Sequence, residues 1–430
     1  MPDAIILNTL IGDPLLTHSA SHVLPVDPIL AEADRCVKCG LCLPKCPTYG
    51  LFRDEAESPR GRIALLQGLV GGGLAPSQQM RAHLDHCLAC RACEAACPSG
   101  VRYGRLIDMG RERLVASRPQ ARRLAMRGLL GLLTRRLPLH VAGALLPALQ
   151  GVVARWPAIA GSSGVGGLMA SIPRLGGLLR WRAVYPAAGT TVRRVNLFTG
   201  CVAGLLDANT LLAGVEVLNR LGWEVAVPPA QGCCGAMHYH AGYAGRSRAL
   251  ARANLAAFSD EAPIVSMASG CAAQLVDYPD LFDAGEADEA RALAARVQDI
   301  SAFLAEVPWP EPLRVKPLQA RVAVHDPCTL RNVLAKAEAP AALLRRIPGV
   351  EIVPLPGNGR CCGAAGTYTL TEPAIARRLR DAKIEELRAA APDMVVSSNI
   401  GCALHLRAGL HAAGLDIEVL HPVQLLARQL

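Results

Sequence analysis

Eight cysteines, in two copies of one spacing pattern, constrain this chain more than any other feature of its sequence. The first copy reads Cys36-x-x-Cys39-x-x-Cys42-x-x-x-Cys46-Pro47, and the second reads Cys87-x-x-Cys90-x-x-Cys93-x-x-x-Cys97-Pro98. Three thiolates at this spacing can reach three corners of one 4Fe-4S cube, whereas the fourth cysteine, which precedes proline, ligates a neighbouring cube. The duplicated pattern therefore predicts two adjacent cubes and a short path for electrons.

The same spacing predicts that the two motifs exchange their fourth ligands. The first cube is then held by Cys36, Cys39, Cys42 and Cys97. The second is held by Cys87, Cys90, Cys93 and Cys46. Two zinc sites or four disulfides would use as many thiols, but neither of these alternatives calls for the duplicated pattern.

Length and composition indicate a globular chain with more than one domain. The chain has 430 residues, of which 51% are hydrophobic, so we expect two or three domains with substantial cores. The first 30 residues have no basic segment ahead of an apolar stretch, so we expect no signal peptide. We therefore assign the 16 cysteines to a reducing, cytoplasmic setting.

The formal net charge is +9, and ten arginines lie between Arg102 and Arg136. Such a stripe could face nucleic acid, an anionic membrane surface or an acidic partner subunit. Neither a nucleic-acid motif nor interleaved aromatic residues accompany it, so we expect no nucleic-acid partner. Two further arginines lie in Ser58-Pro59-Arg60-Gly61-Arg62, the start of a predicted helix, and are expected to hydrogen-bond near a cluster.

Residues 121–190 are rich in Arg, Leu, Gly and Pro and are predicted to form a helical linker. Their uncharged run, 137–154, is too short and too interrupted by proline for a membrane-spanning helix. It would suit a helix lying on a membrane surface, against an apolar partner or against the protein itself. The glycine-rich run 161–167 follows no predicted strand and has no P-loop lysine, so it predicts no nucleotide site.

The rest of the chain is an internal repeat. Three segments of the first copy, 195–201, 232–235 and 264–271, match the segments 322–328, 360–363 and 395–402 of the second. We divide the chain into an N-terminal arm (1–30), a ferredoxin-like domain for the two cubes (31–120), the linker (121–190), repeat 1 (191–315) and repeat 2 (316–430).

Each repeat is predicted to alternate strands with helices. In repeat 1 we expect strands at 194–198, 224–227 and 264–267, and helices at 209–221 and 246–258. This order favours a parallel sheet in each repeat, so the chain is α+β overall, with a helical two-cluster domain followed by two α/β repeats. Because each repeat cysteine follows a predicted strand, the thiols should gather at the carboxyl edge of the sheet.

Four thiols at one sheet edge can ligate a cluster or metal, act as a redox dithiol, or be buried small residues. Each adjacent cysteine pair is followed by a glycine, which would let the backbone approach a bulky inorganic group and so favours ligation. The candidate cofactor ligands are Cys201, Cys233, Cys234, Cys271, Cys328, Cys361, Cys362, Cys402 and His405. His405 stands where repeat 1 has Gln274, so the two sites are expected to differ; His238 and His240 are weaker candidates.

Taken together, these motifs resemble the iron-sulfur subunit of bacterial glycolate oxidase. The resemblance rests on residues 36–49, 58–62, 86–104, 232–235 and 399–402, and it covers about residues 31–430. The repeats are similar to the CCG domains of heterodisulfide reductase and of succinate or fumarate reductase relatives. In those relatives the last motif is usually C-x-x-C, whereas here it ends in Gln274 and His405.

The resemblance implies an electron-transfer subunit of a glycolate oxidase or dehydrogenase complex that is inactive alone. Such a subunit takes electrons from FAD-containing partner subunits and passes them towards the quinone pool, as a peripheral protein at the inner, cytoplasmic membrane. In the relatives of the CCG domains the full cysteine set holds a non-cubane cluster, and each repeat here lacks one thiolate of that set. The chain has no flavin or nicotinamide fingerprint, so FAD belongs on the partner and no catalytic residue is assigned here.

Three alternatives remain open at this point. Subunits with the same layout serve the oxidation of D-lactate or glycerol 3-phosphate. The repeats could instead perform two-electron chemistry in a thiol-disulfide reductase of the heterodisulfide type. The chain could also be a redox-sensing or assembly protein without a catalytic partner.

Overall fold

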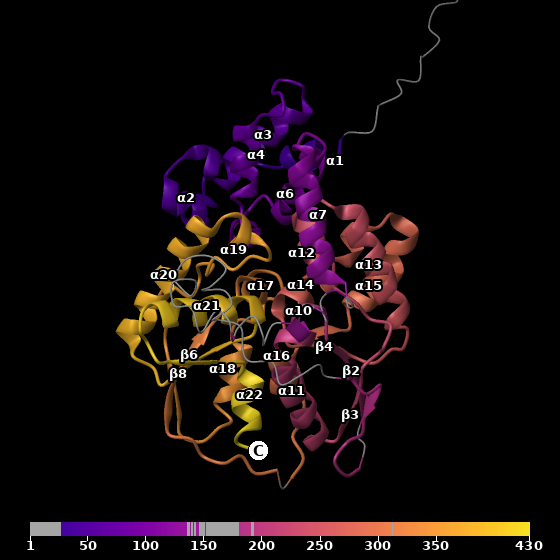
Figure 1. Ribbon diagram of the computed structural model, residues 1–430, viewed down its shortest axis with the longest axis vertical. Helices are drawn as coiled ribbons and strands as arrows, with labels where there is room; N and C mark the ends of the chain where they lie inside the picture. The colour runs from indigo at the N-terminus through magenta and orange to yellow at the C-terminus, as the bar shows by residue number, and fades with distance from the viewer. Residues whose placement is uncertain are drawn as a thin grey trace, which may run out of the picture.

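The computed structural model describes residues 27–135, 138, 141, 143–145, 151, 180–190, 193–311 and 313–430. The predicted arm before residue 27, the glycine-rich run 161–167 and most of the uncharged run 137–154 lie outside these residues. A helical domain forms one end of the molecule, and the two α/β repeats lie side by side at the other (Figure 1).

The helical domain consists of short helices connected by the cysteine loops. Its elements are α1 (Pro28–Ala33), η1 (Leu43–Lys45), α2 (Pro47–Phe52), η2 (Glu55–Glu57), α3 (Pro59–Val70), α4 (Gln78–Asp85), α5 (Ala92–Ala95) and α6 (Tyr103–Val115). Proline begins both α2 and α3, where its missing N–H costs no helical hydrogen bond. Ser58 caps α3 by accepting a hydrogen bond from the amide of Gly61 at 2.9 Å. The core of the domain contains Leu66, Leu84 and Leu106, all fully buried.

Helix α7 (Gln120–Thr134) runs from the helical domain along the repeats (Figure 1). Leu124 and Leu132 on this helix are exposed. Among the described residues, no helix has both the length and the apolar character needed to cross a membrane.

Each repeat contains a mainly parallel sheet, which confirms the predicted fold class. The repeat 1 sheet has the order β1-β3-β2-β4-β5 and the repeat 2 sheet the order β7-β6-β8-β9. All pairs are parallel except β1 with β3. The strands are β1 (Val184–Tyr185), β2 (Arg193–Phe198), β3 (Trp223–Ala226), β4 (Ile264–Ser266), β5 (Val297–Asp299), β6 (Ala320–His325), β7 (Val350–Val353), β8 (Met394–Ser397) and β9 (Glu418–Leu420).

Helices cover these sheets and place the cysteines at their carboxyl edges. In repeat 1 the helices are α10 (Val202–Leu206), α11 (Ala208–Arg220), α12 (Ala236–His240), α13 (Ala244–Ala257), α14 (Ser269–Val276), η3 (Tyr278–Leu281), α15 (Ala284–Ala294) and α16 (Ile300–Glu306). In repeat 2 they are α17 (Cys328–Asn332), α18 (Ala339–Leu344), α19 (Tyr368–Thr371), α20 (Pro373–Ala390), α21 (Ile400–Ala412) and α22 (Pro422–Ala427). The strands predicted in repeat 1 correspond to β2, β3 and β4, and its two predicted helices to α11 and α13.

The two repeats share one hydrophobic core. Helix α22 at the end of repeat 2 packs against α11 of repeat 1, and α16 of repeat 1 packs against α18 of repeat 2. Buried side chains of both repeats, among them Leu218 and Leu426, belong to one apolar cluster. The Ser269 amide, at the start of α14, also donates at 2.9 Å to the carbonyl of Ser398, which lies just before α21. The repeats are thus one structural unit.

Candidate iron-sulfur centres

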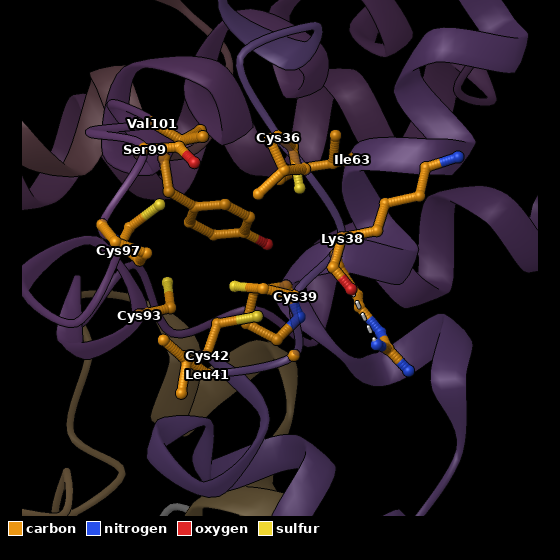
Figure 2. Close-up of a pocket in the computed structure, with 16 residues that line it drawn as sticks. Cys36, Lys38, Cys39, Leu41, Cys42, Ile63, Cys93, Cys97, Ser99 and Val101 are labelled. Atoms are coloured by element: carbon orange, nitrogen blue, oxygen red, sulfur yellow. Dashed lines mark hydrogen bonds between the residues drawn. The ribbon is translucent and has the colours of Figure 1, made fainter.

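One pocket of the helical domain is lined by five cysteines of the two motifs. Its cysteines are Cys36, Cys39, Cys42, Cys93 and Cys97. Figure 2 shows their side chains around a common space, with Ile63 and Val101 on its walls. A largely apolar pocket lined by cysteines of both motifs fits an iron-sulfur cube, which four thiolates can hold.

A second pocket adjoins the first and is lined by the remaining motif cysteines. Its cysteines are Cys46, Cys87 and Cys90, together with Cys93, which also lines the first pocket. Both pockets contact Pro59, Cys93 and Tyr103. Each pocket therefore combines cysteines of both motifs, and the structure brings all eight residues to two neighbouring sites.

Equivalent residues of the two motifs adopt left-handed backbone conformations. Lys38 and Ala89, which precede the second cysteine of each motif, have φ of 56° and 49°. Gly40 and Arg91, which follow it, have φ of 87° and 59°. Such φ values bend the loop sharply and point successive amides to the same side. In the second loop the Ala89 amide donates to Cys87 Sγ at 3.4 Å, as expected of a loop that surrounds an anionic cluster.

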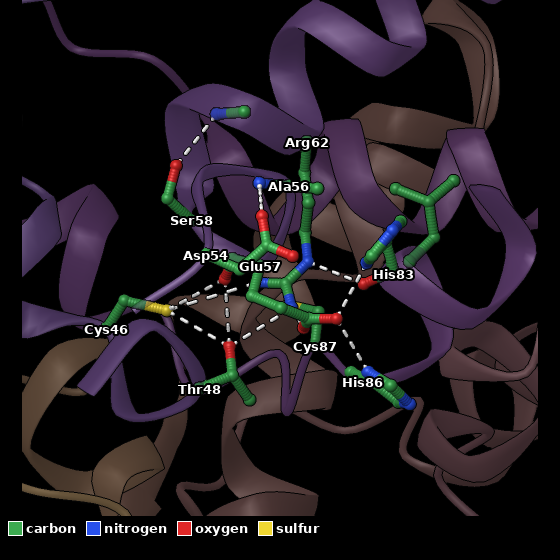
Figure 3. Close-up of polar contacts among 12 residues, drawn as sticks. Cys46, Thr48, Asp54, Ala56, Glu57, Ser58, Arg62, His83, His86 and Cys87 are labelled. Atoms are coloured by element: carbon green, nitrogen blue, oxygen red, sulfur yellow. Dashed lines mark hydrogen bonds and ion pairs between the residues drawn. The ribbon is translucent and has the colours of Figure 1, made fainter. Parts of the chain in front are cut away.

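Cys46 in the second pocket contacts a buried cation and a hydroxyl group (Figure 3). Arg62, only 1% exposed, donates to Cys46 Sγ at 3.9 Å and to Thr48 Oγ1 at 3.0 Å. Thr48 Oγ1 itself lies 3.3 Å from Cys46 Sγ. Of the two arginines at the start of α3, Arg62 is therefore the one that hydrogen-bonds to a motif cysteine. Arg60 donates instead to the Lys38 carbonyl at 3.1 Å.

Glu57 compensates the charge of Arg62, and no motif in the sequence marks this residue. Its Oε2 accepts from Arg62 at 2.6 Å, and its Oε1 lies 2.7 Å from Nδ1 of both His83 and His86. The hydrogen bond with Glu57 raises the pKa of His86. Because the two histidines are distant from Glu57 in sequence, no local spacing could have indicated the network.

The protonation chemistry of the second pocket suits metal ligands. Burial raises the pKa of the Cys90 and Cys93 thiols, so without a cation they stay protonated at neutral pH. Iron replaces the proton on each thiol and neutralises the buried thiolate charge. The residues present therefore fit the cluster that their spacing predicts.

The four cysteines of each repeat converge at one sheet edge. In repeat 1, Cys201 Sγ lies 3.4 Å from Cys233 Sγ, and Cys234 and Cys271 are near them. In repeat 2, Cys328 Sγ lies 4.0 Å from Cys361 Sγ, and Cys362 lies next to Cys402. None of the cysteines is in a disulfide.

The glycine after each cysteine pair has a structural reason that the sequence did not reveal. Gly235 and Gly363 have φ of +90° and +91°. A Cβ on Gly235 would lie 2.6 Å from Ser247 Oγ on α13, and one on Gly363 would lie 2.7 Å from the Ala376 carbonyl on α20. A helix therefore approaches the backbone closely at both glycines.

The histidines have different surroundings from one another. His405 Nε2 lies 3.1 Å from the Ala376 carbonyl oxygen, and His238 Nε2 lies 3.0 Å from Thr134 Oγ1. His240 Nδ1 lies 2.9 Å from an Asp108 carboxylate oxygen. His325, which the sequence motifs do not mark, is the histidine whose ring nitrogen lies within 4.8 Å of the sulfurs of Cys362 and Cys402. The sequence feature that could have identified His325 is its position three residues before Cys328. The equivalent residue of repeat 1 is Phe198.

The second pocket lies directly against repeat 2. Cys90, Cys328 and Cys361 belong to one hydrophobic cluster. The side chain of Asn332, at the end of α17, donates to the Cys90 carbonyl at 2.8 Å, and Tyr368 donates to the His86 carbonyl at 2.9 Å. The cysteines of the second pocket and of repeat 2 are therefore neighbours.

Repeat 1 meets the helical domain through charged groups instead. Arg91 pairs with Asp277 at 2.6 Å, and Arg102 pairs with Asp280. Arg111 on α6 donates to the His240 carbonyl at 3.1 Å. These contacts fix the orientation of the domain on the repeats.

Comparisons with known proteins match the three cysteine-rich parts. Residues 32–101 match the family model of the 4Fe-4S dicluster domain. Residues 195–276 and 322–407 match that of the cysteine-rich domain. These matches support iron-sulfur clusters in the chain.

Curated relatives match along nearly the whole length. The glycolate oxidase iron-sulfur subunit of Escherichia coli (strain K12) is 36% identical over 401 residues, which cover 90% of this chain and 92% of that protein. The probable glycolate oxidase iron-sulfur subunit of Bacillus subtilis (strain 168) is 30% identical over 408 residues, 90% of this chain and 91% of that protein. Lactate utilization protein A of Geobacillus thermodenitrificans (strain NG80-2) is 33% identical over 54% of this chain and 98% of that protein. With two such matches over nine-tenths of its length, the chain belongs to the family of glycolate oxidase iron-sulfur subunits.

Proposed function

We propose that this chain is the electron-transfer subunit of a glycolate-oxidising complex. Its relatives and its cysteine pockets both support a role in electron transfer. The observation that carries the proposal is the pair of pockets that meet at Cys93 and Tyr103, the second of which contacts the repeat 2 cysteines. Three thiol clusters in a row suit the passage of single electrons.

In this proposal the two cubes have crossed ligand sets. Cys36, Cys39, Cys42 and Cys97 hold the first cube in the first pocket. Cys87, Cys90, Cys93 and Cys46 hold the second cube in the second pocket. The pocket linings support this assignment, because Cys97 lines only the first pocket and Cys46 only the second.

We extend the proposal to an iron-sulfur centre at the cysteines of repeat 2. A hydrogen bond with Cys361 and burial together raise the pKa of the Cys328 thiol. Cys361, Cys362 and Cys402 are buried, and Cys328 is half-buried. A thiol-disulfide reductase needs an accessible thiolate, so this burial favours ligation over the reductase alternative.

The electrons come, in this proposal, from an FAD-containing partner subunit. Oxidation of glycolate to glyoxylate would deliver two electrons to the flavin of that partner. When bound, the clusters supply the one-electron chemistry. The chain's own residues position the clusters, exclude water with apolar walls such as Ile63 and Val101, and place Arg62 and Thr48 beside Cys46.

We also propose contact with the cytoplasmic face of the inner membrane, where the electrons pass towards quinone. Helix α7 supports this contact, because it exposes Arg122 and Arg127 together with Leu124 and Leu132. Exposed arginines and leucines on one helix suit an anionic membrane surface.

The test is reduction of the clusters by substrate. The complex is purified anaerobically through this chain with its flavoprotein partner, and glycolate, D-lactate or glycerol 3-phosphate is added in parallel. We expect glycolate to give the EPR signals of reduced cubes in the complex. In the isolated chain the cubes should remain oxidised with glycolate but be reduced by dithionite. Glycolate oxidation by the isolated chain, or flavin reduction in the complex without cube reduction, would contradict the proposal.

A further inference from the structure

His325 is the last residue of β6 and lies at the cysteine edge of repeat 2. Its side chain is buried, with 2% exposure. One of its ring nitrogens and the sulfurs of Cys362 and Cys402 all lie within 4.8 Å of one another. Imidazole and thiolates at such separations form a set of metal-binding donors.

The hydrogen bonding of His325 leaves one ring nitrogen available. Nδ1 lies 3.0 Å from Ser397 Oγ on the neighbouring strand β8, and Nε2 is buried without a hydrogen-bond partner among the described residues. With Ser397 accepting the Nδ1 proton, Nε2 carries a free lone pair. A metal-ligating histidine is usually held in this way by a hydrogen bond from its other nitrogen.

The corresponding position of repeat 1 has no such donor. Phe198 and Ser266 are paired in the register of β2 and β4, as His325 and Ser397 are in that of β6 and β8. The Phe198 ring packs against Phe258, with ring centroids 6.0 Å apart. The two repeats share a backbone arrangement at this place but differ in the one side chain that could ligate a metal.

We propose that His325 is a nitrogen ligand of the iron-sulfur centre of repeat 2. The proposal rests on the ligation of iron by repeat 2 that is part of the proposed function. It assigns the nitrogen ligand to His325 rather than His405, whose Nε2 lies at the Ala376 carbonyl. Repeat 1 offers thiolates without this histidine.

A neutral imidazole in place of a thiolate makes a centre less negative and raises its reduction potential. The repeat 2 centre would then attract electrons from the cube of the second pocket, whose ligand Cys90 shares an apolar cluster with Cys328 and Cys361. In the transfer, one electron leaves the reduced cube, which is oxidised, and the repeat 2 centre is reduced by the same electron. His325 therefore sets the direction of transfer out of the ferredoxin-like domain.

The first test uses the unmodified full chain. It is loaded anaerobically with iron and sulfide, and the nitrogen couplings of its paramagnetic centres are measured by pulsed EPR with and without ¹⁵N-labelled histidine. We expect iron beyond that of the two cubes and a histidine nitrogen coupled to the additional centre. Iron confined to the two cubes, or an additional centre without histidine nitrogen, would overturn the proposal. If iron is confined to the two cubes, glycolate can still reduce those cubes in the complex. Failure of this proposal is therefore distinguishable from failure of the proposed function.

Two variants then identify the histidine, and each introduces the residue found in repeat 1. His325→Phe should abolish the nitrogen coupling of the additional centre and leave the signals of both cubes. His405→Gln should preserve the coupling. Loss of the coupling in His405→Gln, or its retention in His325→Phe, would overturn the assignment.

A milder variant keeps the test decisive if His325→Phe does not fold. Ser397→Ala removes the partner of Nδ1 and should weaken iron binding at the additional centre about 10–100-fold. Ser266→Ala is the matched control, because Ser266 pairs with Phe198 and its hydroxyl donates to the Ala268 carbonyl. Equal iron affinity in wild type and Ser397→Ala would contradict the role of His325.

Discussion

At the scale of single residues, Cys46 shows how the fold places a charged and a polar group beside a motif cysteine. Arg62 and Thr48 bring a charge and a hydroxyl group to its sulfur, and Glu57 neutralises the arginine. Hydrogen bonds to ligand sulfur stabilise the more negative, reduced cluster, so they raise its potential. The sequence identified Arg62 as a candidate because it lies in a marked helix start. Thr48 and Glu57 carry no such signal, since their roles depend on contacts made in the folded chain.

Thr48→Val tests this tuning. Thr48 Oγ1 donates to the Glu57 carbonyl at 3.0 Å and lies 3.3 Å from Cys46 Sγ. A Cys46 thiolate on a bound cube can only accept, so it competes with that carbonyl for the hydroxyl proton, and the variant removes this donor. We expect the midpoint potential of the second cube to fall by about 20–60 mV, the one-electron equivalent of about 0.5–1.5 kcal/mol for one hydrogen bond. An EPR-monitored redox titration measures the shift.

The first cube serves as the internal control, because Thr48 lines only the second pocket. Thr48→Ser keeps the hydroxyl group and should keep the potential. An unchanged or raised potential of the second cube in Thr48→Val would show that the hydroxyl does not donate to the cluster ligand.

The histidines show where reasoning from sequence reached its limit. His405 is a candidate by sequence because it stands three residues after Cys402, but its ring hydrogen-bonds to the Ala376 carbonyl of α20. His325 lies near the thiols because parallel strands align their carboxyl ends. Comparison of the two repeats located the carboxyl edge of the sheet. The position of the His325 side chain at that edge followed only from the register of the strands in the structure.

At the scale of elements, short helices connect the cysteine sites. Helix α17 begins at Cys328 and ends at Asn332, whose side chain donates to the Cys90 carbonyl. Helix α22 extends from repeat 2 onto α11 of repeat 1. The longer elements β2, β3, β4, α11 and α13 could be predicted from hydrophobic periodicity. The two-residue strand β1 could not, because it is defined by its pairing with β3 and not by its own residues.

Leu426→Ala tests the coupling between the repeats. Leu426 on α22 is fully buried in the shared core, so truncation should lower the free energy of unfolding by about 2–5 kcal/mol. Because α22 packs against α11, hydrogen exchange should accelerate in α11 of repeat 1 as well as in repeat 2. Leu370→Ala, at a position 46% exposed, is the control and should change stability by less than about 0.5 kcal/mol. Faster exchange confined to repeat 2 would contradict a shared core.

At the scale of the whole molecule, the thiol sites are arranged in a sequence from one end towards the middle. The first pocket adjoins the second across Cys93 and Tyr103, and the second adjoins repeat 2 at Cys90. The duplicated motif predicted the two neighbouring pockets. The contact with repeat 2 rather than repeat 1 could not be predicted, because the repeats carry the same cysteine pattern and differ in how the helical domain docks. Charged pairs such as Arg91 with Asp277 fix that docking.

Four single variants of the full chain, reduced anaerobically and measured by EPR, test the crossed ligand sets: Cys39→Ala, Cys97→Ala, Cys46→Ala and Cys90→Ala. If the motifs exchange their fourth ligands, Cys39→Ala and Cys97→Ala perturb the same cube signal, while Cys46→Ala and Cys90→Ala perturb the other. The crossed arrangement, on which the proposed electron path is built, would be contradicted by the opposite grouping of effects. In that result Cys46→Ala perturbs the same cube signal as Cys39→Ala, and Cys97→Ala perturbs the same cube signal as Cys90→Ala.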